Sequence, residues 1–213
     1  MFTPDKWPLL VVCAGMVTAA VIDGWKFKVP NRLTFPLVIS GWLLGAWYSF
    51  FADQPPHFQP TALHWYDSRL FASVLGTALG FILLWPALFI GGMGEGDVKM
   101  QMGWGSWIGA YFGVHLGMWI IFYSFCVGVI VGGILGMAIM VLSGRWREHM
   151  EHARLIITDL AKEGASGAAE KATERRPRWT RLPYGIPLCI GNVGYILLYE
   201  LDQLDGWLFF LRP

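Results

Sequence analysis

The 213-residue chain is poor in charge, because only 15% of its residues are Asp, Glu, Lys or Arg, where a soluble domain usually carries about 25%. Hydrophobic residues make up 55%, and the mean hydropathy is +0.47. This balance argues against a soluble enzyme, a nucleic-acid-binding protein and a disordered protein. The 12 Trp, 14 Phe and 26 Gly suit helices packed in a bilayer, where Trp anchors the interface and Gly permits close approach. The composition therefore predicts an integral membrane protein.

Cysteine is also scarce, and the three cysteines form no CxxC pair. Cys13, Cys126 and Cys189 lie in apolar stretches, which gives no support for a disulfide framework or a zinc site. The sequence contains no G-x-S-x-G, H-E-x-x-H or P-loop motif. The spacing of His149 and His152 fits a metal site, but a solvated helix face is the simpler interpretation. We therefore expect no metal and no cofactor.

Long apolar runs predict about six transmembrane helices, since about 20 apolar residues cross a bilayer. These runs cover residues 7–22, 33–51, 70–90, 98–111, 114–142 and 184–201. The stretch from Met100 to Leu142 has no Asp, Glu, Lys or Arg and is twice as long as one span needs, so we expect it to fold back near Gly113. In the last run, Asn192 is expected to form a hydrogen bond between helices. The predicted fold class is an all-α polytopic bundle in one membrane-embedded domain, residues 1–213.

Basic residues are distributed unevenly between the two ends of these spans. One face receives the loops 23–33, 91–99 and 143–181, and it holds thirteen basic residues against three on the other face. The thirteen are Lys26, Lys28, Arg32, Lys99, Arg145, Arg147, Arg154, Lys162, Lys171, Arg175, Arg176, Arg178 and Arg181, and the three are Lys6, Arg69 and Arg212. The positive-inside rule makes the first face cytoplasmic and leaves both chain ends outside. Loop 143–181 begins as an amphipathic helix pattern and continues as a polar linker.

A glycine-rich segment, GGMGEGDVK at 91–99, precedes the fourth predicted helix. Its glycines allow positive φ and close backbone approach, and the segment presents Asp97 at the cytoplasmic edge of the membrane. Asp23 lies at the end of the first span, on the same face and at a similar depth. Two carboxylates at one membrane boundary are a functional hypothesis. The structural alternatives are an N-cap role for Asp97 and two ordinary solvated carboxylates at helix ends.

A close pair of aspartates has a defined chemistry. Both cannot ionise at low cost, so the pair shares one proton near neutral pH. The ionised carboxylate then takes a proton from water while the protonated one donates to a carbonyl oxygen, and the roles reverse afterwards. Asp23 and Asp97 are therefore candidates for amide hydrolysis without a metal.

Three motifs resemble those of the type IV prepilin peptidases, within the group of GxGD intramembrane aspartyl proteases. The first is IDGWKFKVPNRLTFPLVISGWLLG, in which Asp23 is followed by Val29, Pro30 and Asn31. The second is GGMGEGDVKM, which fits a GxGDxK pattern around Asp97, and the third is LPYGIPLCIG before the last helix. The motifs occur in the order of that family and cover residues from about 20 to 195. The resemblance places Pro30 and Asn31 near the substrate.

The resemblance also implies roles for the remaining residues of the motifs. Asp23 and Asp97 would be the catalytic pair, and Gly94 and Gly96 would shape the active-site loop and leave room for a substrate backbone. Lys99 would orient Asp97, with a snorkelling surface lysine as the equally simple alternative.

The substrates implied by this resemblance are prepilin-like precursors, with a short basic leader before a hydrophobic helix, cut at the cytoplasmic boundary. The other implied partners are the lipid bilayer and a pilus or secretion assembly machinery, in the prokaryotic inner membrane. Longer family members carry an N-terminal segment with CxxC motifs that is associated with N-methylation. This chain has no CxxC, so we expect a short, peptidase-only form.

Two non-enzymatic alternatives remain at the level of sequence. The same two carboxylates would also serve a membrane assembly or transport protein that binds a proton or a cation, and a catalytically idle scaffold is a third interpretation. The VPN and PYGIP motifs favour the protease, because a carrier has no need of them.

Overall fold

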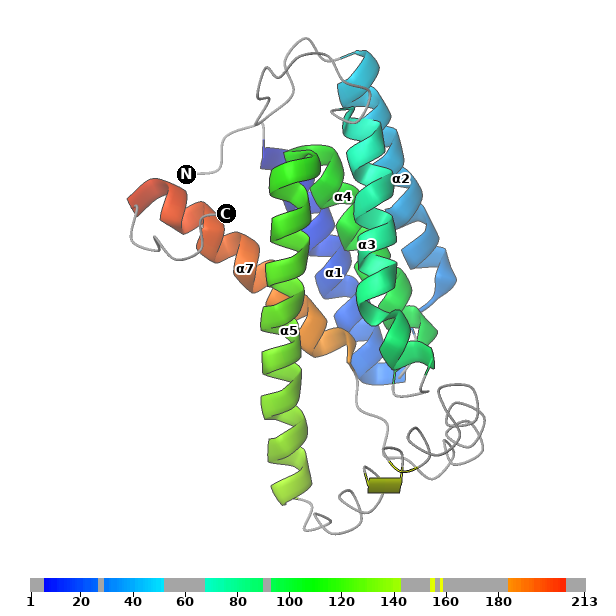
Figure 1. Ribbon diagram of the computed structural model, residues 1–213, viewed down its shortest axis with the longest axis vertical. Coiled ribbons are helices and arrows are strands. Elements are labelled where there is room, and N and C mark those ends of the chain that lie inside the picture. The colour runs from blue at the N-terminus through cyan, green and yellow to red at the C-terminus, as the bar shows by residue number, and fades with distance from the viewer. Residues whose placement is uncertain are drawn as a thin grey trace.

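The computed structural model describes residues 6–26, 29–51, 68–89, 93–142, 154–155, 158 and 184–205. These residues form six labelled α-helices (Figure 1), which are α1 (Trp7–Lys26), α2 (Asn31–Phe50), α3 (Arg69–Phe89), α4 (Glu95–Phe112), α5 (Val114–Leu142) and α7 (Gly185–Asp205). The prediction of an all-α helical bundle with six helices is confirmed. Most of loop 143–181, including His149 and His152, lies outside the described residues.

The start of α4 differs from the prediction. The helix begins at Glu95 rather than at residue 98, because Gly94 takes the N-cap position in an extended conformation. Asp97 is therefore the third residue of the helix, and the alternative that made it the N-cap is wrong. Helix α1 in turn continues past Ile22 to Lys26, which places Asp23 inside its last turn.

Helices α4 and α5 are joined by Gly113 alone, where the chain was predicted to fold back. Its φ of 85° lies in the left-handed region that favours glycine. The Gly113 N–H donates to the carbonyl of Gly109 and closes α4, and the Gly113 carbonyl accepts from Gly117 and opens α5. Arg69, which is 5% exposed, donates from Nη1 to the Tyr111 carbonyl at 2.8 Å. The side chain thus satisfies a carbonyl at the end of α4.

Helix α4 lies at the centre of the bundle, and most of its residues are buried. It approaches α3 so closely that glycines carry the contact. A Cβ added to Gly105 would lie 2.1 Å from the carbonyl oxygen of Gly76, and one added to Gly109 would lie 2.2 Å from that of Ala72. Small residues of this kind let helix backbones pack directly against each other in membrane proteins.

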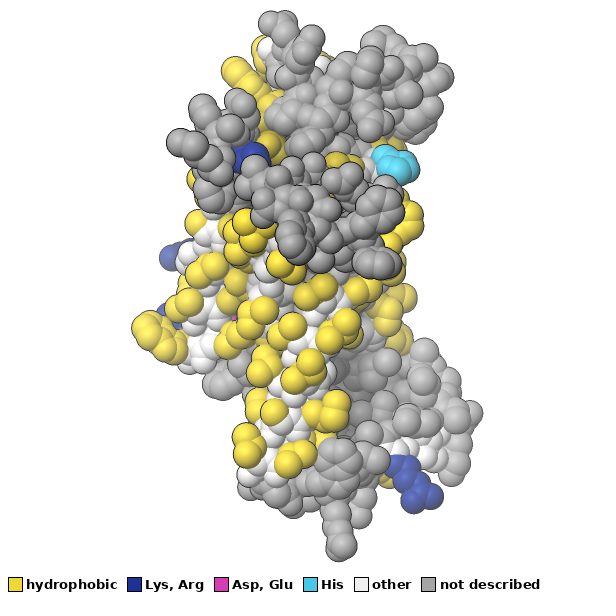
Figure 2. Space-filling view, turned by 90° about the vertical axis from the view of Figure 1, so that its left-hand side faces the viewer, with side chains coloured by type: hydrophobic (Ala, Val, Ile, Leu, Met, Phe, Trp, Pro, Cys, Tyr) yellow, Lys and Arg dark blue, Asp and Glu magenta, His cyan; other side chains and the backbone are white. Residues whose placement is uncertain are grey.

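The outer helices carry the apolar surface. Four of the described helices, α1, α2, α3 and α5, are long and apolar enough to cross a membrane. Figure 2 shows hydrophobic side chains over most of the described surface on one side of the molecule, with few charged ones. Helix α4 does not meet the same hydropathy criterion, and other helices surround it, so its side chains face protein rather than lipid.

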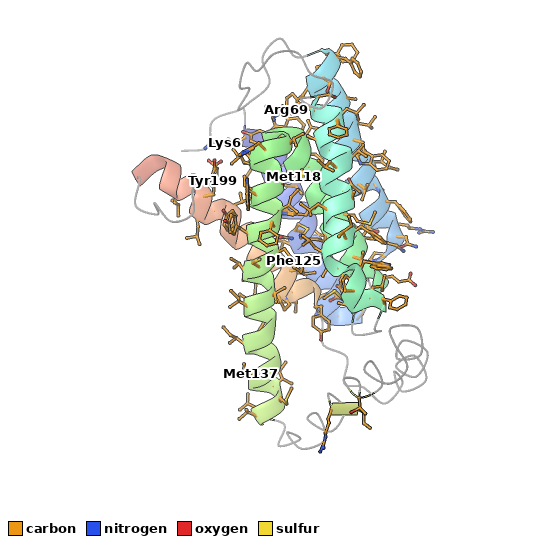
Figure 3. All side chains as sticks on the ribbon, in the orientation of Figure 1. Lys6, Arg69, Met118, Phe125, Met137 and Tyr199 are labelled. Atoms are coloured by element: carbon orange, nitrogen blue, oxygen red, sulfur yellow. The ribbon has the colours of Figure 1, made fainter. Side chains whose placement is uncertain are left out.

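Helix α5 extends beyond the other described helices at its C-terminal end (Figure 1). Gly132 still packs near Pro187 of α7, since a Cβ at Gly132 would lie 3.3 Å from the Pro187 Cβ. From Gly133 to Leu142 the helix has no charged residue. Met137 in this part is 56% exposed, and Figure 3 labels it on the stretch of α5 that extends below the other helices.

Candidate active site

The two candidate aspartates lie where four helix ends meet. The end of α1 and the starts of α2, α4 and α7 come together toward the lower end of the bundle (Figure 1). The three motifs found in the sequence, which are far apart along the chain, therefore come together in space. Asp23 and Asp97 are each 5% exposed.

Asp23 is held by the first residue of α7. Its Oδ2 accepts a hydrogen bond from the backbone N–H of Gly185 at 3.0 Å. The first N–H groups of a helix have no partner within the helix and carry partial positive charge, so they bind a carboxylate well. A Cβ on Gly185 would lie 2.9 Å from the same oxygen, which explains why a glycine stands at this position.

Asp97 lies in the first turn of its own helix, α4. Its carboxyl group stands at the third helical position, beside the backbone of the N-cap residue Gly94, the place of the acidic residue in a capping box. A Cβ on Gly94 would lie 3.3 Å from Asp97 Oδ2. The other oxygen, Oδ1, is buried and has no hydrogen-bond partner among the described residues. Asp97 thus has one oxygen beside the start of α4 and one that is available to a ligand.

The two carboxyl groups lie close enough for the charge of Asp23 to act on Asp97. Tyr184, which directly precedes Gly185, belongs to the same neighbourhood. The Tyr184 side chain lies close enough to the carboxyl group of Asp97 for the two to interact electrostatically. In the part of the chain that the structure describes, no group of three or more His, Cys, Asp or Glu side chains is arranged to hold a metal ion.

The VPN segment packs against the first turn of α4. A Cβ on Gly96 would lie 3.0 Å from the Val29 Cβ and 3.1 Å from the Val29 nitrogen, so the two backbones pass close together. Pro30 is the N-cap of α2, and its carbonyl accepts the N–H of Leu33 at 2.9 Å. The structure therefore brings Gly96 and Pro30 next to the start of the helix that carries Asp97.

Lys99 joins the starts of α4 and α2. Its Nζ donates to Asn31 Oδ1 at 3.1 Å and lies 3.6 Å from Glu95 Oε2. The same ammonium lies 5.5 Å from the centre of the Phe35 ring, within the range of a cation–π contact. These partners place Lys99 beside the candidate site, on its exposed side.

Three residues of this region had no role in the sequence analysis. Tyr184 and Gly185 belong to the motif LPYGIPLCIG, but the motif alone predicts no role for either residue. Gln101 follows Asp97 by four residues, and that spacing puts both on one face of a helix. The predicted interhelical hydrogen bond of Asn192 is confirmed, because its Nδ2 donates to Gln101 Oε1 at 2.8 Å.

Comparisons with known proteins agree on one family. Residues 10–137, more than half of the chain, match the model of the Type IV leader peptidase family. Two curated relatives, from Burkholderia pseudomallei strains 1026b and K96243, are each described as a prepilin leader peptidase/N-methyltransferase. Each is 28% identical over 105 residues, which is 46% of this chain and 28% of the relative. The match thus spans little more than a quarter of the relatives' length. No solved structure matches the chain.

Proposed function

The chain belongs to the type IV leader peptidase family, and from this premise we propose that it is a membrane aspartyl endopeptidase. Its substrates are prepilin-like precursors, from which it removes the leader at the cytoplasmic boundary of the membrane. One observation carries the proposal more than any other. Asp23 and Asp97 are buried together where the ends of α1, α4 and α7 meet, and one carboxylate oxygen has no partner among the described residues.

The surroundings of the two aspartates favour a different catalytic role for each, one as the base and one as the acid. Asp23 receives the N–H of Gly185, whereas Oδ1 of the buried Asp97 has no donor among the described residues, so the ionised form is favoured at Asp23 relative to Asp97. In this proposal Asp23 takes a proton from water, the water oxygen bonds to the peptide carbonyl carbon, and Asp97 gives its proton to the carbonyl oxygen. Asp23 then protonates the leaving nitrogen as the C–N bond breaks, and Asp97 takes a proton back from the hydroxyl group.

The predicted topology is consistent with this substrate. The end of α1 and the starts of α2 and α4 lie at the end of the bundle that also holds the two aspartates (Figure 1). The sequence places the excess of Lys and Arg in the loops at that end, and such loops remain cytoplasmic. A basic leader on the cytoplasmic side would then present its cleavage site to the carboxyl pair.

The first prediction concerns the pair itself. Asp23→Asn and Asp97→Asn each keep the shape of the side chain but remove the acid–base function, so we expect processing to fall about 10³-fold or more. The measurement is the mobility shift of a prepilin co-expressed with wild type or variant. Glu95→Gln is the matched control, because Glu95 lies in the same turn as Asp97 with its side chain 76% exposed, and it should retain activity within about threefold.

Two outcomes would decide against the proposal. If either asparagine variant processes the precursor at the wild-type rate, the dyad is not the catalytic centre. If the wild type cleaves no candidate precursor, the same carboxylates are better assigned to a transport or assembly protein.

The second prediction concerns pH. Because one carboxyl group must be ionised and the other protonated at the same time, the cleavage rate should pass through a maximum and fall on both sides. Cleavage of a fluorogenic leader peptide by purified protein across pH 4 to 9, with protein integrity checked at each pH, measures the profile. A rate that rises to a plateau with pH would indicate a single base instead of a pair.

A further inference from the structure

Buried polar atoms without partners are concentrated on one side of α4. Among the described residues, four buried side-chain atoms lack a hydrogen-bond partner, and they are Asp97 Oδ1, Gln101 Nε2, Asn192 Oδ1 and Thr34 Oγ1. Three of the four belong to the interface between α4 and α7. Native proteins leave few such atoms unsatisfied, so a cluster of three needs an explanation.

The three residues follow one another along the facing sides of α4 and α7, starting at Asp97, and are called the polar seam below. Gln101 lies one helical turn after Asp97 on the same face of α4, where side chains are about 5–6 Å apart at Cβ. Asn192 lies seven residues, or two turns, after Gly185, the residue that holds Asp23. The hydrogen bond between Asn192 and Gln101 closes the seam on the inner side. Both amide residues are 0% exposed.

The amide pair has spare hydrogen-bonding capacity of both kinds. One hydrogen bond between the amides leaves Gln101 with an unused N–H donor and Asn192 with an unused oxygen acceptor. Exchanging the oxygen and nitrogen of both amides leaves the same capacity, one donor and one acceptor. A water molecule needs two to four polar partners in a buried site. Because water both accepts and donates hydrogen bonds, it can accept from the free donor and donate to the free acceptor of this amide pair.

We propose that Gln101 and Asn192 form an internal water-binding site directly behind the carboxyl pair, and that this water is the one consumed in hydrolysis. The second half rests on the proposed peptidase function, and the first half does not. The water would bridge Gln101 and Asn192 toward Asp97 Oδ1, a span that one molecule covers over a single helical turn. An apolar precursor helix excludes bulk water from its surroundings, so a stored water supplies the reactant that the chemistry requires.

The water site itself is tested without any peptidase assay. The chain contains only two asparagines, Asn31 and Asn192, so selective ¹⁵N-asparagine labelling gives two side-chain amide signals, which Asn31→Ser assigns. In perdeuterated detergent, we expect a nuclear Overhauser contact between the Asn192 amide and a long-lived water, and its loss in Gln101→Leu. Asn31 is exposed and serves as the positive control for water contact. An Asn192 amide without water contact, beside an Asn31 amide that has it, overturns the site.

The use of the water is tested by kinetics. The double variant Gln101→Leu/Asn192→Leu replaces a buried polar pair with apolar groups of similar size, which costs little stability because no partner is left unpaired. We expect kcat to fall at least tenfold with KM unchanged, since leader binding does not involve the seam. Thermal unfolding in detergent verifies that the double variant remains folded, and if it does not, Gln101→Met/Asn192→Leu, with an unbranched apolar side chain at position 101, is measured with the same expected loss of kcat.

A matched control separates water supply from helix packing. Ser73, also 0% exposed, donates from Oγ to the Ser106 carbonyl at 2.8 Å and so ties α3 to α4 away from the aspartates. Ser73→Ala should leave kcat within about twofold. An unchanged kcat in the double leucine variant, or an equal loss in Ser73→Ala, overturns the assignment of the seam water to hydrolysis. If wild type cleaves nothing, the peptidase proposal fails while the Asn192 signal still decides the water site.

Discussion

Asp97 and Asp23 are equally buried, but the molecule holds them by different means. Asp97 sits on α4, whose position is set by backbone contacts with α3 at glycines such as Gly105. Asp23 sits on α1, where its position depends on one hydrogen bond from Gly185 of α7. The other end of α1 is joined to the same helix by the ion pair between Lys6 and Glu200.

The difference indicates which changes each carboxyl group tolerates. A backbone contact has no side chain to adjust, so an added methyl group at α3–α4 must separate two helices. At Gly185 the closest contact of an added methyl group is the carboxylate oxygen of Asp23 at 2.9 Å, which a rotamer change can move, while the contact with Asp23 Cβ at 3.1 Å needs a shift of a few tenths of an ångström. Such a change should move Asp23 and leave the fold intact. The first kind of change should cost stability, and the second should cost activity.

The largest expected effect is on the α3–α4 contact. In Gly105→Ala the new Cβ would lie 2.1 Å from the carbonyl oxygen of Gly76, so the helices must move apart at a cost of about 1–3 kcal/mol or more. We expect a lower unfolding temperature in detergent and a poor yield of folded protein.

The control for this prediction is Gly133→Ala on α5, where an added Cβ has nothing within 4 Å. That variant should be neutral or gain up to about 1 kcal/mol from helix propensity. Equal stability of both variants would contradict the view that backbone packing fixes α4.

The next effect is on activity alone. In Gly185→Ala the Cβ would contact Asp23 Oδ2 at 2.9 Å, so the carboxyl group must turn away from its place beside Asp97. A misplacement of about 1 Å can cost about 10²-fold in rate, so we expect kcat to drop 10- to 100-fold at nearly wild-type thermal stability. Gly194→Ala lies on the same helix with nothing within 4 Å of the added Cβ and should behave like wild type.

The smallest effect should come from Lys99. Its contacts with Asn31 and Glu95 lie on the exposed side of the site, and such contacts contribute about 0–1 kcal/mol. We expect Lys99→Met to change stability by less than about 1 kcal/mol and cleavage by less than threefold. A large loss of kcat with a shifted pH maximum would instead support the role that the family resemblance implied, the orientation of Asp97.

The sequence predicted most helix positions because they follow from local hydropathy. The fold-back near Gly113 is an example, since a charge-free run twice the length of a span has to turn somewhere. It also identified Asp23 and Asp97 as candidates, because charges are rare in apolar helices. The start of α4 was missed, because the choice between Gly94 and Asp97 as N-cap depends on backbone conformation rather than on residue preference.

The partners of the candidate residues could not be predicted. The bond between Gly185 and Asp23 joins positions 162 residues apart, and nothing local in the sequence pairs them. The contact between Gln101 and Asn192 likewise depends on how α7 lies across α4. Composition predicted that glycines would permit close helix approach, but it contains no information on which glycine faces which helix.

The overhang of α5 bears on the depth at which the carboxyl pair would lie in a membrane. Gly132 packs near Pro187, two residues after the glycine that holds Asp23. Residues 133–142 continue as an apolar helix for about 15 Å beyond that level. A bilayer thick enough to cover this overhang also covers the level of Asp23. The carboxyl group would then lie below the membrane surface, and a precursor helix would reach it sideways, through the hydrocarbon layer.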